Sequence, residues 1–229
     1  MMPDVSLRIG INIGNALLAR RDPATCALRG IAVDLARELG RALGTPVDLV
    51  PYDSAGRMAD DARGGAWDVA FLAADAARAT DISFTAPYLE IDATYLVPPA
   101  SMLTTIGDVD REGVRIAVSD KSAYDLALKR SITRAEIVRA PSVDASVDLF
   151  FAQRLEALAG LRPLLVDVAQ THHGCRVLDG RFTAILQAIG APSGRDTAPL
   201  DAFVRDAKAS GLIAHLIEQH HIRGVTAAS

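Results

Sequence analysis

Short apolar runs alternate with segments of helical periodicity from the start of the chain. Residues 7–12 predict the first strand, and a loop at 20–23 follows it. Ile31, Leu35, Leu39 and Leu43 then recur every four residues on one helix face, and Gly44 follows as the stop signal. This alternation is typical of an α/β protein with largely parallel sheets.

The later elements follow from the same patterns. Pro98 and Pro99 interrupt an extended run and predict a linker to a second unit, in which Ser119 or Ser122 caps a helix. The remaining expected elements are strands at 47–52, 67–73 and 113–118, helices at 58–62 and 143–155, an apolar run at 155–161, a β-rich stretch at 176–189, and two final helices separated at Ser210 and Gly211.

Length and charge restrict the classes of protein. The 229 residues, 50% of them hydrophobic, can bury a sizeable core in one large or two small domains. A net charge of -4, with acids and bases mixed along the chain, argues against nucleic-acid binding or attachment to an anionic membrane. No apolar run approaches the roughly 20 residues that span a bilayer, so direct membrane insertion is not expected.

Residues 1–6 contain neither a basic start nor an apolar signal core. We therefore expect either that a leader has been removed or that the protein is cytoplasmic.

The chain offers little for metal, redox or nucleophilic chemistry. Cys26 and Cys175 exclude a disulfide framework, and although one bridge between them stays open, two unpaired thiols are favoured. His172, His173 and Cys175 lack the spacing of a zinc site, and no Gly-x-Ser-x-Gly elbow is present. Neither a metal nor a cofactor is expected.

Arg78 is the strongest candidate binding residue. It follows the predicted strand at 67–73 and precedes the Phe-x-x-Pro-Tyr segment at 84–88. Ligands of open α/β sheets gather at the carboxyl ends of strands, and a guanidinium offers paired donors that fit a carboxylate. Arg78 is therefore predicted to bind an organic acid, the alternative being a solvated arginine at a helix start.

Four segments in chain order resemble the bacterial extracellular solute-binding proteins of family 3, the polar amino-acid-binding type used by ABC importers. They are RGIAVDLARELGRALG at 29–44, GGAWDVAFLAADAARATDISFTAPY at 64–88, GVRIAVSDKSAYDL at 113–126 and SGLIAHLIEQHH at 210–221. The resemblance implies an α/β fold of the periplasmic-binding-protein-like type II, with two lobes joined by two hinge crossover strands near 95–99 and 180–185. Lobe 1 would comprise 5–97 plus 185–229, and lobe 2 would comprise 98–184.

The resemblance also implies a binding site. Arg78 corresponds to the family arginine that binds the ligand carboxylate, and Ala73 corresponds to a Ser/Thr position that also contributes to binding. Ser122 and Ala123 fall on the anion turn of the second lobe. Lys121 replaces a common glycine of that turn, where it could add a second positive charge or be an exposed turn lysine.

The departures from the family pattern concern the rest of the ligand. Leu161 stands where the family places an acidic residue that receives the α-ammonium. Rings that usually sandwich the ligand are replaced by Asn15, Leu18 and Ser54, and Asn12 stands at a position that is often Asp. The site is therefore expected to hold a carboxylate without being tuned for a standard α-amino acid.

Two acids near the predicted hinge keep an amino-acid ligand open. Glu90 and Asp92 could supply the missing negative charge, the alternative being that they are solvated acids on the hinge surface.

The function that the resemblance implies is ABC-type import by a monomeric, non-enzymatic binding protein of the periplasm. Its partners would be a small organic acid ligand and an ABC transporter permease. A cyclohexadienyl-dehydratase-like enzyme is an alternative, with Glu90, Asp92 or Asp167 as the carboxylates available for acid catalysis. A cytoplasmic ligand sensor is a further alternative.

Overall fold

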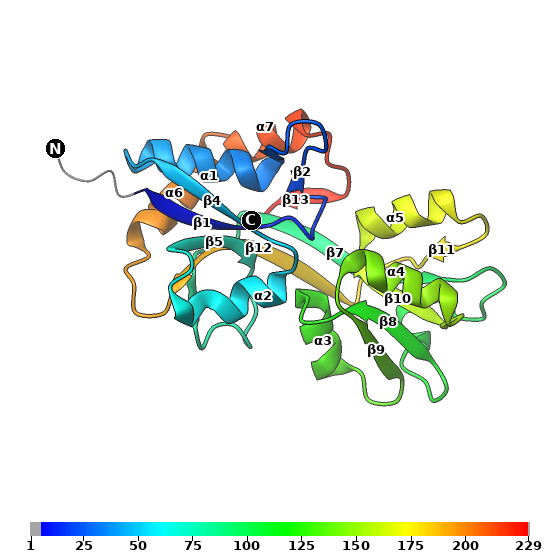
Figure 1. Ribbon diagram of the computed structural model, residues 1–229. Coiled ribbons are helices and arrows are strands. Elements are labelled where there is room, and N and C mark those ends of the chain that lie inside the picture. The colour runs from blue at the N-terminus through cyan, green and yellow to red at the C-terminus, as the bar shows by residue number, and fades with distance from the viewer. Residues whose placement is uncertain (1–5, 229) are drawn as a thin grey trace. The chain divides into compact units, whose positions relative to one another are not determined.

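A computed structural model describes residues 6–228, so most of the segment 1–6 discussed above lies outside the described residues. The chain forms two compact units (Figure 1). Unit 1 contains the chain up to Glu90 and again from Leu186, and unit 2 is Ile91–Ile185. The chain passes between them within strand β7 (Leu89–Val97) and again within strand β12 (Thr183–Pro192).

The sheet of unit 1 has a parallel centre. β1 (Leu7–Asn12) lies between β4 (Val47–Tyr52) and β5 (Val69–Ala73), parallel to both. β12 pairs antiparallel with β5 and with β6 (Ile82–Phe84). The predicted α/β class is confirmed, and the returning strand β12 adds antiparallel pairing at one side of the parallel centre.

Helices and short elements complete unit 1. The described ones are α1 (Ile31–Ala42), α2 (Ala55–Asp60), the 3-10 helix η1 (Asp61–Gly64), α6 (Ala198–Ala209), α7 (Leu212–Gln219) and β13 (Val225–Ala227), which pairs with β7. The division between α6 and α7 falls at Ser210 and Gly211 as predicted, with Gly211 in the left-handed conformation at φ 77.

The loop predicted at 20–23 is partly wrong, because Arg20–Arg21 form a strand, β2, paired with β3 (Leu28–Arg29). The Asp22 carboxylate accepts hydrogen bonds from the backbone N–H groups of Ala24 and Thr25, which closes the turn of this hairpin.

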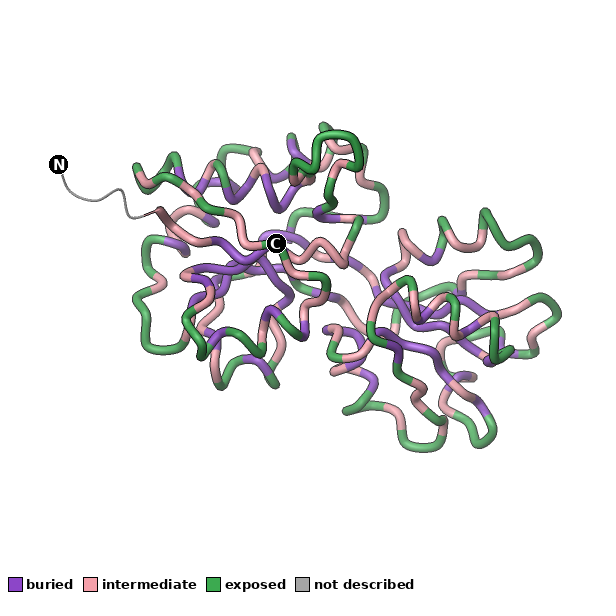
Figure 2. Tube along the Cα trace, in the orientation of Figure 1, coloured by how far each residue is buried: buried purple, intermediate pink, exposed green. Residues whose placement is uncertain are grey.

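Unit 1 has its own apolar core (Figure 2). Trp67, Met58, Leu72 and Ile82 pack together with no more than 2% of any of them exposed. Trp67 donates its indole N–H to the Met58 carbonyl over 2.9 Å, so the one polar atom of this ring is satisfied inside the core.

Unit 2 repeats the pattern of a parallel centre. β8 (Arg115–Ser119) lies parallel to β10 (Ala157–Leu161) and to β9 (Glu136–Ala140), while β7 pairs antiparallel with β10. Its other elements are α3 (Ala123–Ser131), α4 (Val143–Ala152), α5 (Arg162–Thr171), η2 (Ile106–Asp108) and β11 (Arg176–Val177). Leu96, Phe150, Leu158 and Leu165 form the centre of its core.

Strand β9 and helix α5 of unit 2 were not predicted from the sequence. β9 has exposed and partly buried positions without clear alternation, so its pattern is weak. α5 starts directly after a buried strand, with Arg162 and Pro163 as its first residues, and proline fits there because the first helical N–H groups need no intrahelical partner.

The compact units differ from the predicted lobes at the first crossing. The lobes 5–97 plus 185–229 and 98–184 place that boundary at the end of β7, near Pro98, whereas unit 2 begins inside the strand at Ile91. The reason is that residues 93–97 of β7 pair with β10 and β11 of unit 2.

Asp68 ties β1 to the residues just before β5. The Asp68 carboxylate accepts hydrogen bonds from the backbone N–H of Arg8 over 3.1 Å and from Arg8 Nη2 over 2.9 Å, and Arg195 Nη2 lies 3.3 Å away. The side-chain hydrogen bonds from Arg8 hold the pKa of Asp68 below its ordinary value. Since the pKa is depressed in the folded state, this stabilisation is present above the unfolded pKa and is lost as the pH falls through the folded one.

We expect Asp68→Asn to lower the free energy of unfolding by about 1 kcal/mol at pH 7, because two charge-assisted hydrogen bonds weaken. The difference in the free energy of unfolding between variant and parent should shrink below about pH 3.9, because the Asp68 carboxylate of the unfolded parent begins to bind protons there. Urea unfolding at pH 7 and pH 3 measures both values. Asp206→Asn is the control, since the Asp206 side chain is 76% exposed beside Arg205. An equal loss at both pH values for Asp68→Asn would contradict the assignment.

Candidate functional site

The predicted binding residues of unit 1 lie at the carboxyl ends of its parallel strands. Asn12 ends β1, Ala73 ends β5, and Ser54 follows the end of β4 by two residues. Because the three strands are parallel neighbours, these residues share one edge of the sheet, where ligands of open α/β sheets bind.

The loop after β1 packs closely against the loop after β4. Ile13 donates its N–H to the Tyr52 carbonyl over 2.8 Å, and a Cβ atom at Gly14 would lie 2.0 Å from the Asp53 carbonyl oxygen. Glycine is therefore required at position 14. This approach brings the Asn12 and Asn15 loop beside Ser54.

Asn12 and Ser54 already have structural partners. Asn12 Oδ1 accepts the N–H of Gly14 over 3.1 Å, and Ser54 Oγ accepts the N–H of Arg57 at the start of α2 over 3.3 Å. Within residues 6–228, two buried side-chain oxygens lack a hydrogen-bond partner, and these are Asn15 Oδ1 and the Tyr88 hydroxyl. The unpaired Asn15 oxygen is therefore enclosed by the protein rather than open to solvent.

Arg78 lies inside unit 1, with 6% of its surface exposed. It occupies the turn between β5 and β6, where its N–H donates to the Asp75 carbonyl over 3.0 Å. Arg78 Nη1 donates to the Ala73 carbonyl over 2.8 Å, so the structure brings these two predicted site residues into contact. The alternative of a solvated helix-start arginine is wrong, because the residue is buried and lies in a turn.

The Arg78 guanidinium stays charged at neutral pH although it is buried. Removal from water lowers its pKa to about 10, and the negative charges of Asp75 and Asp60 oppose that shift. A buried cation of fixed position and charge is what recognition of a carboxylate requires.

In unit 2 the predicted anion turn lies between β8 and α3. Ser122 caps α3, and its Oγ accepts the N–H of Asp125 over 3.1 Å, while Ala123 is the first helical residue. Asp125 is buried and accepts the Lys121 N–H over 2.9 Å, and an ion pair of 2.9 Å joins it to Arg139. The turn is therefore held rigidly by one buried carboxylate.

Tyr124 follows this turn and is buried. Burial raises the pKa of its hydroxyl to about 12, and hydrogen bonding with Ser122 and Ser119 opposes the rise. The phenol therefore remains protonated at physiological pH and can act as a donor.

Leu161 ends β10 at the same sheet edge as Ser119, the last residue of the parallel strand β8. Leu161 is 4% exposed. The position at which the family resemblance expects an acid is thus an apolar part of unit 2.

Asp92 is engaged within unit 2 by arginines that the sequence analysis did not single out. Arg181 Nη1 donates to its carboxylate over 2.9 Å, and Arg162 Nε lies 3.9 Å from it. Arg162 also hydrogen bonds to the Gly180 carbonyl. These pairings compensate the charge of Asp92 and make it a poor acceptor for a ligand ammonium. Only the fold reveals the cluster, because Asp92 and Arg181 are far apart in sequence.

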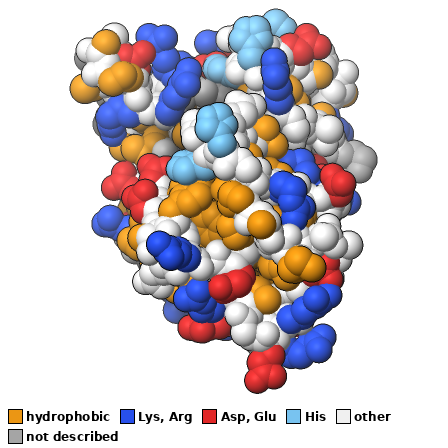
Figure 3. All heavy atoms as spheres, turned by 90° about the vertical axis from the view of Figure 1, so that its right-hand side faces the viewer, with side chains coloured by type: hydrophobic (Ala, Val, Ile, Leu, Met, Phe, Trp, Pro, Cys, Tyr) orange, Lys and Arg blue, Asp and Glu red, His pale blue; other side chains and the backbone are white. Residues whose placement is uncertain are grey.

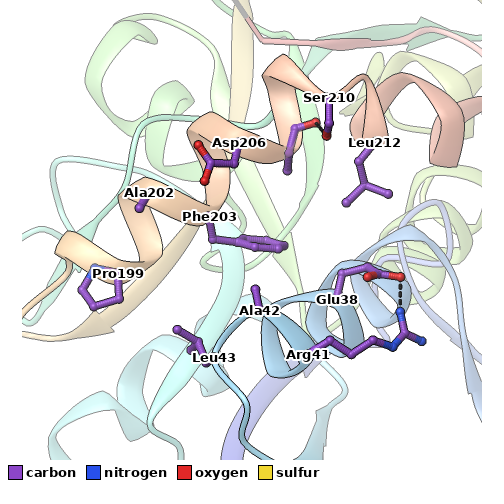
Figure 4. A pocket seen from close by; sticks show the side chains of 11 residues that line it. Glu38, Arg41, Ala42, Leu43, Pro199, Ala202, Phe203, Asp206, Ser210 and Leu212 are labelled. Carbon is purple, nitrogen blue, oxygen red and sulfur yellow. Dashed lines mark hydrogen bonds and ion pairs between the residues drawn. The ribbon is translucent and has the colours of Figure 1, made fainter.

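A groove of about 700 Å³ lies elsewhere in unit 1, between α1, α6 and the start of α7 (Figure 4). Phe203 projects into it, with Leu43 and Leu212 among its other lining residues. α1 ends at Ala42 and leads directly to the amino end of β4, so this groove lies at the opposite edge from Asn12 and Ala73. It is separate from the predicted binding residues.

The structure shows the surroundings of one of the candidate histidines, His172, and of both cysteines. The His172 ring stacks on Phe151 with a centroid distance of 4.0 Å. Cys26 and Cys175 are free thiols and belong to different units. Over residues 6–228, no group of three His, Cys, Asp or Glu side chains is arranged to hold a metal ion.

Side chains of both charges are interspersed on the face shown in Figure 3, around a central area of apolar side chains. Such mixing gives no extended field of one sign on this face. None of the helices in the described part of the chain is both long and apolar enough to cross a bilayer.

Comparison of the chain with known proteins agrees with the fold described above. The model of a family described as bacterial extracellular solute-binding proteins, family 3, matches residues 7–222. No curated protein matches the chain significantly.

Solved structures of the same fold share little sequence with this chain. One is the substrate-binding protein of an amino acid ABC transporter, with 14% identity, a TM-score of 0.80, and coverage of 93% of this chain and 98% of that one. The GluR0 ligand-binding core with L-glutamate has 18% identity, a TM-score of 0.80, and coverage of 95% and 98%. A binding component of an ABC transporter from Wolinella succinogenes, complexed with lysine, has 20% identity, a TM-score of 0.80, and coverage of 93% and 94%. These likenesses confirm the predicted type II fold.

Lys121 provides a test of the anion turn, because it adopts the left-handed conformation with φ 52. A side chain costs about 1 kcal/mol there, whereas glycine does not. We therefore expect Lys121→Gly to be more stable than Lys121→Ala by about that amount, the reverse of the usual order of these residues. Both variants remove the lysine side chain, so the comparison isolates the backbone. Chemical denaturation measures the difference, and an alanine variant as stable as the glycine variant would contradict a strained turn.

Proposed function

The chain belongs to the bacterial extracellular solute-binding proteins of family 3, and from this premise we propose that its two lobes close on a small carboxylate-bearing ligand. In this proposal the closed form delivers the ligand to an ABC importer. Closure follows from a ligand that contacts both lobes only in the closed state.

The observation that carries the proposal is the buried, charged guanidinium of Arg78 at the carboxyl edge of the unit 1 sheet. Asp75 and Asp60 supply negative charge near the buried guanidinium, and a ligand carboxylate matches the paired donors of such a group. In unit 2 the Ser122 turn offers helix N–H groups to the same anion.

The ligand that we propose is not a standard α-amino acid. Leu161 places an apolar side chain where an ammonium partner would stand, and Asp92 is already paired with Arg181. An ammonium buried beside them would lack a counter-charge. Organic acids without an α-ammonium, such as 2-oxo acids or simple carboxylates, meet no such penalty.

Import from the periplasm by a monomer, with a permease as partner, is the setting that we propose for this binding. A structure described as an ancestral amino acid-binding protein, a precursor of cyclohexadienyl dehydratase, shares the fold at 20% identity, a TM-score of 0.79, and coverage of 93% of this chain and 94% of that one. We nevertheless favour a binding protein over a dehydratase, since Asp92, one of the three candidate acids, is paired with arginines. Purified protein should leave the absorbance of prephenate and arogenate unchanged.

Arg78→Gln should weaken binding of any carboxylate found in a thermal-shift screen by about 10- to 100-fold, because hydrogen bonds to a charged group are lost. The screen contains 2-oxo acids, aromatic acids, dicarboxylates and amino acids, and a ligand that binds the folded state raises the melting temperature. Arg63→Gln is the control, since Arg63 is an exposed arginine of the same unit that pairs with Asp81. Circular dichroism verifies folding. A hit that survives Arg78→Gln, or a screen without any acid hit, would argue against this function.

Leu161→Asp tests the exclusion of amino acids. The new carboxylate supplies a partner for an α-ammonium, so we expect α-amino acids to gain affinity relative to the matching 2-oxo acids. Calorimetric titration with leucine and with 4-methyl-2-oxopentanoate, for parent and variant, measures the ratio. Leu161→Asn introduces a polar side chain of similar size without the charge and serves as control. An unchanged ratio would show that position 161 does not face the ligand.

A further inference from the structure

Unit 2 contains a cavity of about 190 Å³ between α4, α5 and the carboxyl half of β10. Both helices contact β10, as their neighbouring positions in Figure 1 indicate. Its wall is mainly apolar, and the main contributors are Val143, Val147, Leu158, Leu161, Leu164 and Leu165.

The cavity is suited to a hydrocarbon group. An apolar cavity of about 150 Å³ in another protein stays dry and binds benzene, so this volume accommodates a group of about six carbon atoms. The Ser146 hydroxyl, which also lines the cavity, donates to the Val143 carbonyl over 2.6 Å and is therefore already satisfied. Water inside would find few partners.

The cavity reaches two segments that the proposed function places against the ligand. Leu161 lines it at the end of β10, and Tyr124 lines it directly after the turn of Ser122 and Ala123. The space therefore continues from the unit 2 part of the predicted binding site toward the core formed by Leu158 and Leu165.

The charged side chains at this cavity select the orientation of a ligand. Asp144 and Asp167 line it and are exposed, so they form an acidic rim around an apolar interior. A ligand carboxylate would be repelled by this rim, whereas an uncharged alkyl or aryl group would not.

We propose that this cavity binds the uncharged hydrocarbon end of a monocarboxylate, a branched chain or single ring of about four to six carbon atoms. The inference rests on the proposed function for the carboxylate end. It explains how a site without the usual sandwiching rings holds an apolar group, since the surface is supplied by α4 and α5.

Benzene probes the cavity without involving the carboxylate site. In the full chain, we expect benzene to shift the methyl NMR signals of the lining leucines and valines, and the shifts should reach a plateau as the benzene concentration rises. Val147→Phe or Leu164→Phe fills the cavity and should abolish the shifts. Val166→Phe is the control, because Val166 is exposed on the same helix α5. Circular dichroism identifies a filling variant that has not folded. Absent shifts in the parent, or shifts that persist in both folded filling variants, would overturn the proposal.

A pair of acids separates this inference from the proposed function. We expect 4-methylpentanoate to bind about 50-fold more tightly than propanoate, because three more carbon atoms are buried. Val147→Phe should remove that advantage and leave propanoate unchanged, whereas Arg78→Gln should weaken both acids. Equal binding of both acids with retained sensitivity to Arg78→Gln would overturn the inference alone. Benzene binding without binding of either acid would leave an apolar cavity in place and overturn its assignment to the hydrocarbon end of a monocarboxylate.

Discussion

The predicted binding site of unit 1 depends on the burial of one guanidinium, that of Arg78. Arg78 is removed from water at the end of β5, and its charge is retained because the Ala73 carbonyl accepts a hydrogen bond and Asp75 and Asp60 supply negative potential. A cation in a low dielectric interacts strongly with any anion that reaches it. In the turn between β5 and β6, the Arg78 N–H donates to the Asp75 carbonyl and Nη1 donates to the Ala73 carbonyl, and these two hydrogen bonds hold the cation in position.

The two units contribute different chemistry. In unit 1 the predicted residues are the buried charge of Arg78 and the polar side chains of Asn12, Asn15 and Ser54 in the loops after β1 and β4. In unit 2 they are the backbone of the Ser122 turn and an apolar wall that begins at Leu161.

Ion pairs inside each unit join segments of the framework, and the Asp125 carboxylate is the buried member among the three named here. Asp125 joins the anion turn to Arg139 on β9, Asp68 joins β1 to β5, and Asp92 joins β7 to Arg181 shortly before β12. Each carboxylate holds segments that are distant in sequence. Solved structures with 14% to 20% identity keep the same fold, so the framework tolerates wide replacement of side chains.

The sequence by itself determined the elements with strong periodicity, because apolar spacing directly reports which face is buried. The strand bounds Leu7–Asn12 and Val47–Tyr52 and the break between α6 and α7 agree with the pattern, and of the two serines expected as caps of α3 the structure selects Ser122. The family segments also selected Arg78 and the departure at Leu161. The tertiary structure alone decided that Arg78 is buried against Ala73, that Asp92 is paired with Arg181, and that a cavity lies behind Leu161. The pairing of Asp92 and the cavity depend on contacts between residues far apart in the chain, and the burial of Arg78 depends on how its turn packs in unit 1, so none of them leaves a local periodicity to read.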